Sequence, residues 1–197
     1  MESMSKPQHK KKRDNRTQTV YSRCLLTRKI ALPITTIGKN LKETIEENVK
    51  STFEGKCVVE GYIKTNSSKI ITHSSGVIER GNNIIFEVVF ECDVCFPVEG
   101  MNISCVAKNI TKAGIRAESY TDVPSPVVVF LAKDHHFNIN YFSDIQEGDK
   151  INVRVIGQRF ELNDKYISII GELIKEKEIH QLQQQQKTKP RIVIEDE

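Results

Sequence analysis

The sequence predicts an α+β protein made of two small units: a strand, a helix and several antiparallel strands, followed by a five-stranded barrel. One amphipathic helix pattern lies near the start, segments rich in Val, Ile and Phe fill most of the rest, and Gly and Asn mark the turns. With 38% hydrophobic residues among 197, the chain can bury a core. Units of roughly 75 residues are near the lower limit for independent folding, so we expect each unit to be stabilised by contact with the other unit or with a partner protein.

The helix is expected between Asn40 and Gly55, after a first strand at Tyr21–Pro33. Asn40 is followed three residues later by Glu43, which is a variant of the capping box that starts helices. Gly55 stands where a glycine commonly ends a helix. An apolar stripe recurs every four residues, at Leu41, Ile45, Val49 and Phe53. Such a stripe packs on a sheet, so the helix should cover one face of the neighbouring strands.

Three strand-like segments follow the helix and complete the first unit, residues 19–97. They span residues 56–64, 69–78 and 84–92, and the Arg-Gly-Asn-Asn sequence at 80–83 supplies the turn before the last of them. Alternation along the last segment places four side chains on one face, namely Phe86, Val88, Phe90 and Cys92.

The second unit, residues 98–173, has the pattern of a barrel. Strand-like segments are expected at residues 101–111, 114–119, 126–132, 150–160 and 166–173. A polar, partly helical stretch at residues 134–146 separates the third segment from the fourth. Five strands with an insertion between the third and the fourth follow the order of an OB barrel.

The two termini differ from these units in composition. Residues 1–18 lack apolar anchors and are expected to form a disordered basic arm. The basic run at residues 10–13 is a nuclear import signal, a nonspecific phosphate contact or simply part of a solvated arm. Residues 174–197 hold good helix formers but few apolar residues, which predicts a helical or disordered tail.

Charge and hydropathy limit the classes of partner. No apolar run approaches the roughly 20 residues that cross a bilayer, and no hydrophobic signal region is visible, so we expect an intracellular protein without membrane association. The net charge of +3 comes from the arm, because residues 17–172 carry 18 basic and 19 acidic side chains. Any RNA contact on the two units should therefore be local and weak.

No residue pattern predicts a catalytic centre, a cofactor or a metal. P-loop, GxGxxG and GxSxG motifs are absent. Cys92 and Cys95 form one CxxC pair, whereas a structural zinc site needs about four ligands, so packed strand cysteines are expected. The five cysteines are an odd number, which favours free thiols over a disulfide framework. Asp134 and His135 lie beside each other without a nucleophile motif nearby.

RNA contact is expected on the barrel, because OB surfaces offer aromatic rings for base stacking beside basic residues. The candidate RNA-binding residues are Lys108, Lys112, Arg116, Phe130, Lys133, His135, His136 and Arg159. Phe130 lies in an apolar run at residues 126–132 and is either a stacking ring or part of the core. The two histidines are expected in a surface loop.

Several short motifs, in order and spacing, resemble one protein family over residues 21–173. They are IGKNL at 37–41, FEGKC at 53–57, GVI at 76–78, FPVEG at 96–100, KINVRVIG at 150–157 and IGEL at 170–173. In the barrel, a further set of residues falls at the spacing that is typical of the same family: Gly100, Ile103, Val106, Ile110 and Gly114. The chain resembles the stalk subunit of DNA-directed RNA polymerase, which is the seventh-largest subunit of the eukaryotic enzyme and is called E-prime in archaea. Its cysteine pair and divergent termini resemble a version from a large DNA virus.

This resemblance implies an RNP-like tip domain followed by an S1-type OB barrel. The tip would dock on the large polymerase subunits near the clamp through Ile37, Gly38, Lys39, Asn40, Ser74, Ser75 and Gly76, and the loop at residues 65–69 would also lie at the polymerase core. The barrel would contact nascent single-stranded RNA or transcription factors, and a small helical subunit would pair with the chain. Such a subunit has no catalytic centre of its own. A viral version would occupy the virion and the host cytoplasm, or the nucleus if residues 10–13 act as an import signal.

Arg116 departs from the family pattern, because many S1 domains carry an aromatic residue at this position. A guanidinium can stack on a base or bind phosphate, but it replaces the sequence-tolerant ring. Two other functions remain open at this point. One is a free-standing single-stranded RNA-binding OB protein acting in translation or RNA decay, and the other is an enzyme with a metal centre built on Asp134, His135 and the cysteines.

Overall fold

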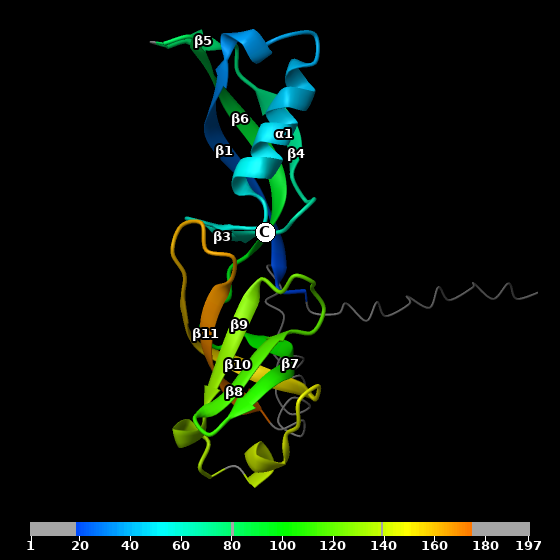
Figure 1. Ribbon diagram of the computed structural model, residues 1–197, viewed down its shortest axis with the longest axis vertical. Coiled ribbons are helices and arrows are strands. Elements are labelled where there is room, and N and C mark those ends of the chain that lie inside the picture. The colour runs from blue at the N-terminus through cyan, green and yellow to red at the C-terminus, as the bar shows by residue number, and fades with distance from the viewer. Residues whose placement is uncertain (1–18, 80, 139, 175–197) are drawn as a thin grey trace, which may run out of the picture.

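The computed structural model describes residues 19–79, 81–138 and 140–174. The predicted basic arm, the predicted tail beyond Ile174 and Arg80 of the predicted turn lie outside the described residues. Figure 1 shows an elongated molecule with a sheet and one helix at one end and a barrel at the other. Among the described residues, no helix has the length and apolar character needed to span a bilayer.

The N-terminal unit, as we call residues 19–97, is a six-stranded sheet with one helix against it. Two thirteen-residue strands, β1 (Tyr21–Pro33) and β6 (Asn83–Cys95), pair antiparallel along their whole length without a register shift. The remaining strands are short and pair in the order β1-β6-β3-β2, with β4 and β5 also on β6. They are β2 (Cys57–Val58), β3 (Gly61–Ile63), β4 (Lys69–His73) and β5 (Val77–Ile78).

The predicted helix is confirmed as α1 (Leu41–Phe53), which covers one face of this sheet. Its apolar stripe packs in one buried cluster with the alternating side chains that the sequence placed on one face of β6. Gly55 follows the helix with a left-handed φ of 70°, as expected of a terminating glycine. The predicted cap differs in one respect: the Asn40 side chain makes no capping hydrogen bond, although its carbonyl accepts the Thr44 N–H at 3.0 Å.

Two of the predicted strands are interrupted. The segment at residues 56–64 divides into β2 and β3, and the segment at 69–78 divides into β4 and β5. The first break is the two-residue turn at Val59 and Glu60, after which Gly61 pairs with Val58 and has a φ of 129°. A Cβ at this position would lie 2.3 Å from the Cys95 carbonyl oxygen, so only glycine allows β3 to approach β6 this closely.

We expect the substitution Gly61→Ala to lower the free energy of unfolding by about 1–3 kcal/mol, because it adds a backbone clash to an unfavourable φ. Gly148→Ala is the matched control: Gly148 also has a positive φ, of 95°, but an added Cβ there meets nothing within 4 Å. Chemical denaturation of both variants measures the difference. An equal loss in the two would mean that the close approach to Cys95 contributes nothing.

The barrel, residues 98–174, is closed and five-stranded, as predicted. Its strands are β7 (Asn102–Thr111), β8 (Gly114–Ser119), β9 (Val127–Ala132), β10 (Lys150–Arg159) and β11 (Ile167–Ile174). They pair in the order β10-β11-β9-β8-β7, and β10 closes the barrel on β7. Among these described strands only β9 and β11 pair in parallel. The predicted insertion between the third and fourth strands holds two short 3₁₀ helices, η2 (Lys133–His135) and η3 (Asn140–Asp144). This architecture is compatible with an OB barrel.

The two units are joined by main-chain hydrogen bonds as well as by packing. The Cys57 N–H donates to the Asp164 carbonyl at 2.8 Å, and the Asn163 N–H donates to the Cys57 carbonyl at 2.9 Å. Asn163 adopts a left-handed φ of 70° in this barrel loop. Cys57, Tyr62 and Cys95 are buried in the same hydrophobic cluster as the barrel core. The units therefore support each other, which agrees with the size argument.

Candidate functional site

Two loops that the family resemblance assigned to docking lie together at the end of the N-terminal unit farthest from the barrel (Figure 1). The first follows the 3₁₀ helix η1 (Ile34–Thr36) and contains Ile37, Gly38, Lys39 and Asn40. The second joins β4 to β5 and contains Ser74, Ser75 and Gly76. Both are placed by the start of β6: the Ile34 N–H donates to the Asn82 carbonyl at 2.9 Å, and Val77 pairs with Ile85. Ile37 is half-buried and the other six residues are exposed.

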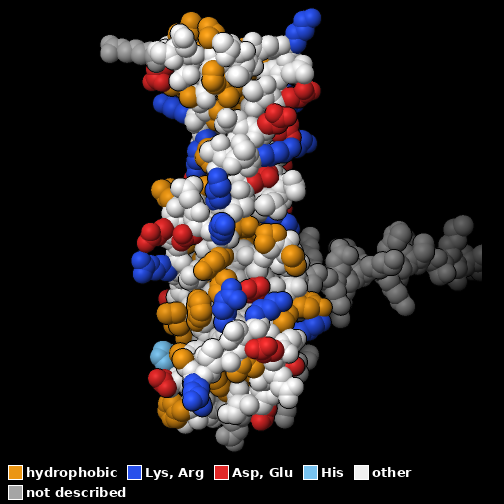
Figure 2. All heavy atoms as spheres, in the orientation of Figure 1, with side chains coloured by type: hydrophobic (Ala, Val, Ile, Leu, Met, Phe, Trp, Pro, Cys, Tyr) orange, Lys and Arg blue, Asp and Glu red, His pale blue; other side chains and the backbone are white. Residues whose placement is uncertain are grey.

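Exposed apolar side chains accompany these loops. Val77 and Ile78 on the two-residue strand β5 are 66% and 75% exposed, and Ile34 on η1 is also exposed. Hydrophobic side chains reach the surface at this end in Figure 2. The sequence analysis missed them as site residues, because it counted Val77 and Ile78 in a longer strand. Two consecutive apolar residues of a strand cannot both face the same core, and that was the available signal.

The β4–β5 loop is held rigidly against β6. The Ser74 N–H donates to the Glu87 carbonyl at 2.9 Å, and the Ser74 hydroxyl accepts the Glu87 N–H at 2.9 Å. A Cβ on Gly76 would lie 2.4 Å from Ile84 Cγ2 and 2.9 Å from the Phe86 ring, so the backbone touches the core here. Ser74 and Gly76 therefore shape this loop, and β5 next to it presents the exposed apolar residues.

The third loop that the resemblance assigned to docking, at residues 65–69, is not part of this end. The Asn66 and Ser68 N–H groups donate to the Glu54 carboxylate, at 2.7 and 2.8 Å, just beyond the C-terminus of α1. Lys64 comes immediately before the loop, and its Nζ lies 3.5 Å from Oδ1 of Asp122 in the barrel. The Glu54 carboxylate thus holds the loop on the barrel side of the N-terminal unit. The role of this loop in docking stays a prediction.

On the barrel, one row of outward-facing residues crosses all five strands. Cross-strand pairing runs from Asn109 through Arg116, Phe130 and Ile170 to Gly157. The row faces outward because the next residue on each of the three central strands is buried, namely Ala117, Val129 and Ile169. Phe130 is 44% exposed, which decides between the two interpretations of this residue: its ring lies on the surface.

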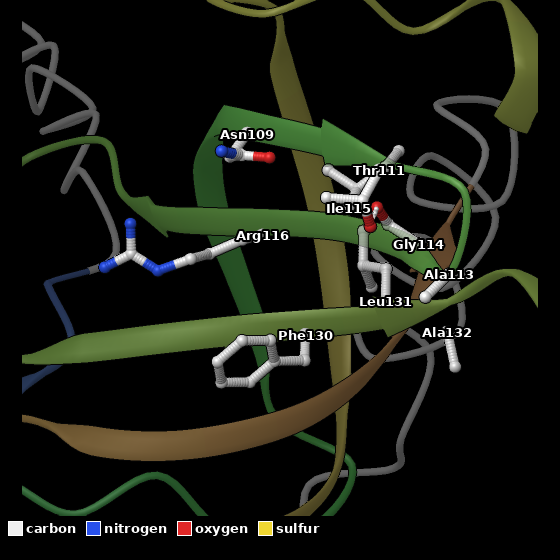
Figure 3. Close-up of a pocket in the computed structure, with 9 residues that line it drawn as sticks. All are labelled: Asn109, Thr111, Ala113, Gly114, Ile115, Arg116, Phe130, Leu131 and Ala132. Carbon is white, nitrogen blue, oxygen red and sulfur yellow. Dashed lines mark hydrogen bonds between the residues drawn. The ribbon is translucent and has the colours of Figure 1, made fainter.

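A hollow of about 450 Å³ lies on one side of the Arg116–Phe130 pair (Figure 3). Small residues at the ends of β8 and β9 leave this space, among them Ala113, Gly114 and Ala132. In Figure 3 the Arg116 side chain and the Phe130 ring project in the same direction from neighbouring strands. Lys112 and Lys133 lie next to the hollow at Ala113 and Ala132, and the Lys133 N–H donates to the Ala113 carbonyl at 2.9 Å. The hollow is thus apolar in its lining with basic side chains beside it.

A second hollow of about 500 Å³ lies on the other side of Arg116. Its lining includes the predicted residue Lys108 and three residues that the sequence analysis missed: Tyr120, Lys165 and Tyr166. Tyr120 lies under the Lys150 ammonium, which is 3.8 Å from the ring centroid. Lys165 and Tyr166 come from the loop before β11, where the sequence showed only a turn. The tyrosines, both partly exposed, were the signal that could have identified them.

The predicted basic residues differ in whether an acidic side chain pairs with them. Arg116 pairs with Glu118 at 3.0 Å and Arg159 pairs with Glu161 at 3.1 Å. Exposed pairs of this kind contribute little and exchange readily for a phosphate. Lys108, Lys112 and Lys133 are exposed, and within the described part of the chain no acidic side chain pairs with them. The surface therefore combines local positive charge with rings, although the barrel as a whole is slightly acidic.

The two adjacent histidines separate into different environments. His135 is exposed on η2, as predicted. His136 is only 2% exposed and stacks on Phe142 with ring centroids 4.8 Å apart. Its Nδ1 donates to the Ala132 carbonyl at 2.6 Å, and its Nε2 accepts the Leu173 N–H at 2.9 Å. The interpretation of His136 as an RNA-contacting loop residue is therefore wrong, because the ring is a buried link between β9 and β11.

The cysteines are all free thiols in the structure. Cys92 lies in the core of the N-terminal unit, whereas Cys95 lies in the cluster shared with the barrel. Burial raises the pKa of the Cys57, Cys92, Cys95 and Cys105 thiols to about 12, so these four are protonated at neutral pH. Among the described residues, no three His, Cys, Asp or Glu side chains are arranged to hold a metal ion.

Comparison with known proteins gives two informative relatives. The chain is 28% identical over 172 residues to a protein of Acanthamoeba polyphaga mimivirus named as DNA-directed RNA polymerase subunit L376, an alignment that covers 80% of this chain and 83% of the relative. It is 24% identical over 177 residues to DNA-directed RNA polymerase II subunit 7 of Arabidopsis thaliana, covering 78% and 98%. No protein-family model matches the chain. These relatives confirm the resemblance stated from the sequence, including its viral version.

Proposed function

We propose, from the chain's kinship with the seventh subunit of RNA polymerase, that it is a non-catalytic stalk subunit of a viral multisubunit, DNA-dependent RNA polymerase. The observation that carries this proposal is the similarity to two named polymerase subunits over about four fifths of the chain. The elongated shape supports it, because the candidate docking end and the barrel lie at opposite ends of the molecule. In this proposal residues 19–97 are the RNP-like tip domain and residues 98–173 are the S1-type OB domain.

The tip would bind the large polymerase subunits through the two loops at its far end and through β5. Exposed apolar side chains beside a rigid loop are typical of the fully buried centre of an interface. Val77 and Ile78 would be buried on docking, while Lys39 and Asn40 would form a polar rim. A small helical subunit is the further partner that the resemblance suggests.

The barrel would contact nascent single-stranded RNA along β8 and β9. Phe130 supplies a stacking ring in the lining of the first hollow, Lys108 and Lys165 line the second, and Lys112 and Lys133 are exposed next to the first. Arg116 would release Glu118 to bind a phosphate or stack on a base. The slightly acidic barrel keeps this contact weak, which suits a subunit that is tethered to the enzyme and must let RNA slide past.

The substitution Phe130→Ala tests this surface. Because stacking on an aromatic ring contributes about 1–3 kcal/mol per base, we expect RNA affinity to fall about 5- to 140-fold. Fluorescence anisotropy with a labelled single-stranded RNA at fixed salt measures the change. Tyr141→Ala is the matched control, since Tyr141 is exposed to a similar degree but lines neither hollow. Equal affinity of wild type and Phe130→Ala would remove Phe130 from the site.

A free-standing RNA-binding protein of translation or RNA decay is the competing function, and the names of the relatives do not favour it. Affinity purification of the tagged chain from cells that produce it distinguishes the two functions. We expect the large polymerase subunits to co-purify in stoichiometric amounts. Recovery of the chain alone, with salt-sensitive RNA binding, would support the competing function instead.

A further inference from the structure

Two of the five cysteines face each other directly across a strand pair. Cys24 on β1 is the register partner of Cys92 on β6, in the middle of the thirteen-residue pairing that has no bulge. Both side chains lie on the face covered by α1, because Leu26 and Phe90 next along that face are buried in the same cluster. The other cysteines do not form such a pair: Cys57 and Cys95 each face Tyr62.

The hydrogen-bond pattern sets the spacing of this pair. The Ile34 N–H, just past the end of β1, donates to Asn82 across the strands. Because antiparallel pairs alternate in type, Cys24 and Cys92, ten positions along each strand, are also a hydrogen-bonded pair. The Cα atoms of such a pair lie about 5.5 Å apart, and this is within the commonest range for disulfides, about 5.5–6 Å. The opposing Cβ atoms of a hydrogen-bonded pair lie about 5.5 Å apart, whereas a disulfide needs about 3.5–4.5 Å, so the two strands must move together by about 1 Å for the bond to form.

Access differs between the two thiols. Cys92 is 1% exposed, whereas Cys24 is partly exposed at the edge of the sheet, since β1 is a terminal strand of its order. A small oxidant in solution can therefore reach Cys24 but not Cys92. Burial keeps the Cys92 thiol protonated, with its pKa raised to about 12. The reaction must accordingly begin at Cys24.

We propose that Cys24 and Cys92 are a redox modification site, at which a hydroperoxide converts the two thiols into an intramolecular disulfide. The Cys24 thiolate attacks a peroxide oxygen, the O–O bond breaks, and Cys24 becomes a sulfenic acid as one water is released from hydrogen peroxide. The Cys92 sulfur then attacks the Cys24 sulfur. The S–S bond forms, the S–O bond breaks, and the departing hydroxide takes the Cys92 proton as a second water. Both sulfurs are oxidised by one electron each, and the peroxide is reduced by two.

The disulfide would tie the N-terminal strand to the central strand of the sheet. Among the described strands β1 pairs with β6 alone, so opening of the unit from this edge requires these two strands to separate. A covalent link at Cys24 and Cys92 prevents that separation and restricts the unfolded chain. The oxidised protein is thus expected to unfold at a higher temperature than the reduced protein.

The test uses the full chain, treated with dilute hydrogen peroxide under native conditions and then denatured and alkylated. We expect the intact mass to show loss of two hydrogen atoms, three alkylated cysteines, and a Cys24–Cys92 linked peptide after proteolysis. Cys24→Ala should abolish the link, and Cys105→Ala, a buried cysteine of the barrel, should leave it unchanged. Five alkylated cysteines, a link between other cysteines, or a Cys24 that stops at sulfinic acid would each overturn the proposal.

A second measurement does not depend on any variant folding correctly. Iodoacetamide should alkylate the partly exposed Cys24 of the native wild-type protein, and prior peroxide treatment should block that reaction until dithiothreitol is added. Unchanged alkylation of Cys24 after oxidation, or a block that dithiothreitol does not reverse, would contradict the proposed pair.

Discussion

Changing Val77 and Ile78 together to aspartate is expected to release the chain from the polymerase. Both side chains are largely exposed in the free protein, so the fold should tolerate the change. In the docked state the same positions would bury two unpaired carboxylates, which is strongly unfavourable. Since a central interface residue contributes 2 kcal/mol or more, we expect affinity for the large subunits to fall by at least about 30-fold. Co-purification with the tagged variant measures the loss.

The control is Val59→Asp, which introduces one of these two negative charges at a residue that is 74% exposed in the turn between β2 and β3, away from this end. It should co-purify as the wild type does. RNA binding by the isolated double variant should also be unchanged, because the barrel is untouched. If the double variant still assembles normally, docking does not involve β5. If Val59→Asp fails equally, the effect is one of charge and not of position.

The substitution His136→Ala should destabilise the barrel by about 2–4 kcal/mol. It leaves the buried Leu173 N–H and Ala132 carbonyl without their partner, which costs about 1–3 kcal/mol, and it removes the ring that stacks on Phe142. For a chain of this length each kcal/mol corresponds to about 2–4 °C in Tm. The chain has no tryptophan, so thermal unfolding is best followed by circular dichroism.

His135→Ala provides the comparison, because its ring is exposed and should change stability by no more than about 0.5 kcal/mol. His136→Gln would separate the two contributions, since an amide can both donate and accept while lacking the ring. If His136→Ala is as stable as His135→Ala, the hydrogen bonds of His136 between β9 and β11 contribute nothing to the free energy of unfolding, and the prediction is wrong.

Local patterns were the part of this protein that could be predicted from residues alone. The helix from Leu41 to Phe53 follows from a four-residue apolar repeat and a terminating glycine. The five barrel strands appeared near their predicted limits, because their turns carry Gly and Asn and their apolar residues alternate. Where prediction was poorer, as in the segment at residues 56–64, a two-residue turn at 59–60 divides a pattern that otherwise suits one strand, and the two halves pair with each other.

The site residues were predictable only in part. Arg116 and Phe130 were proposed separately, and pairing of β8 with β9 makes them neighbours. Tyr120, Lys165 and Tyr166 lie in loops far apart in sequence and meet only because the barrel closes. The loop at residues 65–69 lies apart from the other two predicted docking loops, and nothing local shows that Glu54 binds its backbone.

By itself, the sequence determined the elements and their order, because periodicity and turn chemistry are properties of neighbouring residues, and it showed the resemblance to a polymerase subunit through the order of its motifs. Only the tertiary structure decided which of two adjacent histidines is buried, that Phe130 faces solvent, and that Cys24 meets Cys92. Each of these depends on strand register and on which face another element covers, and those contacts join residues that no local pattern connects.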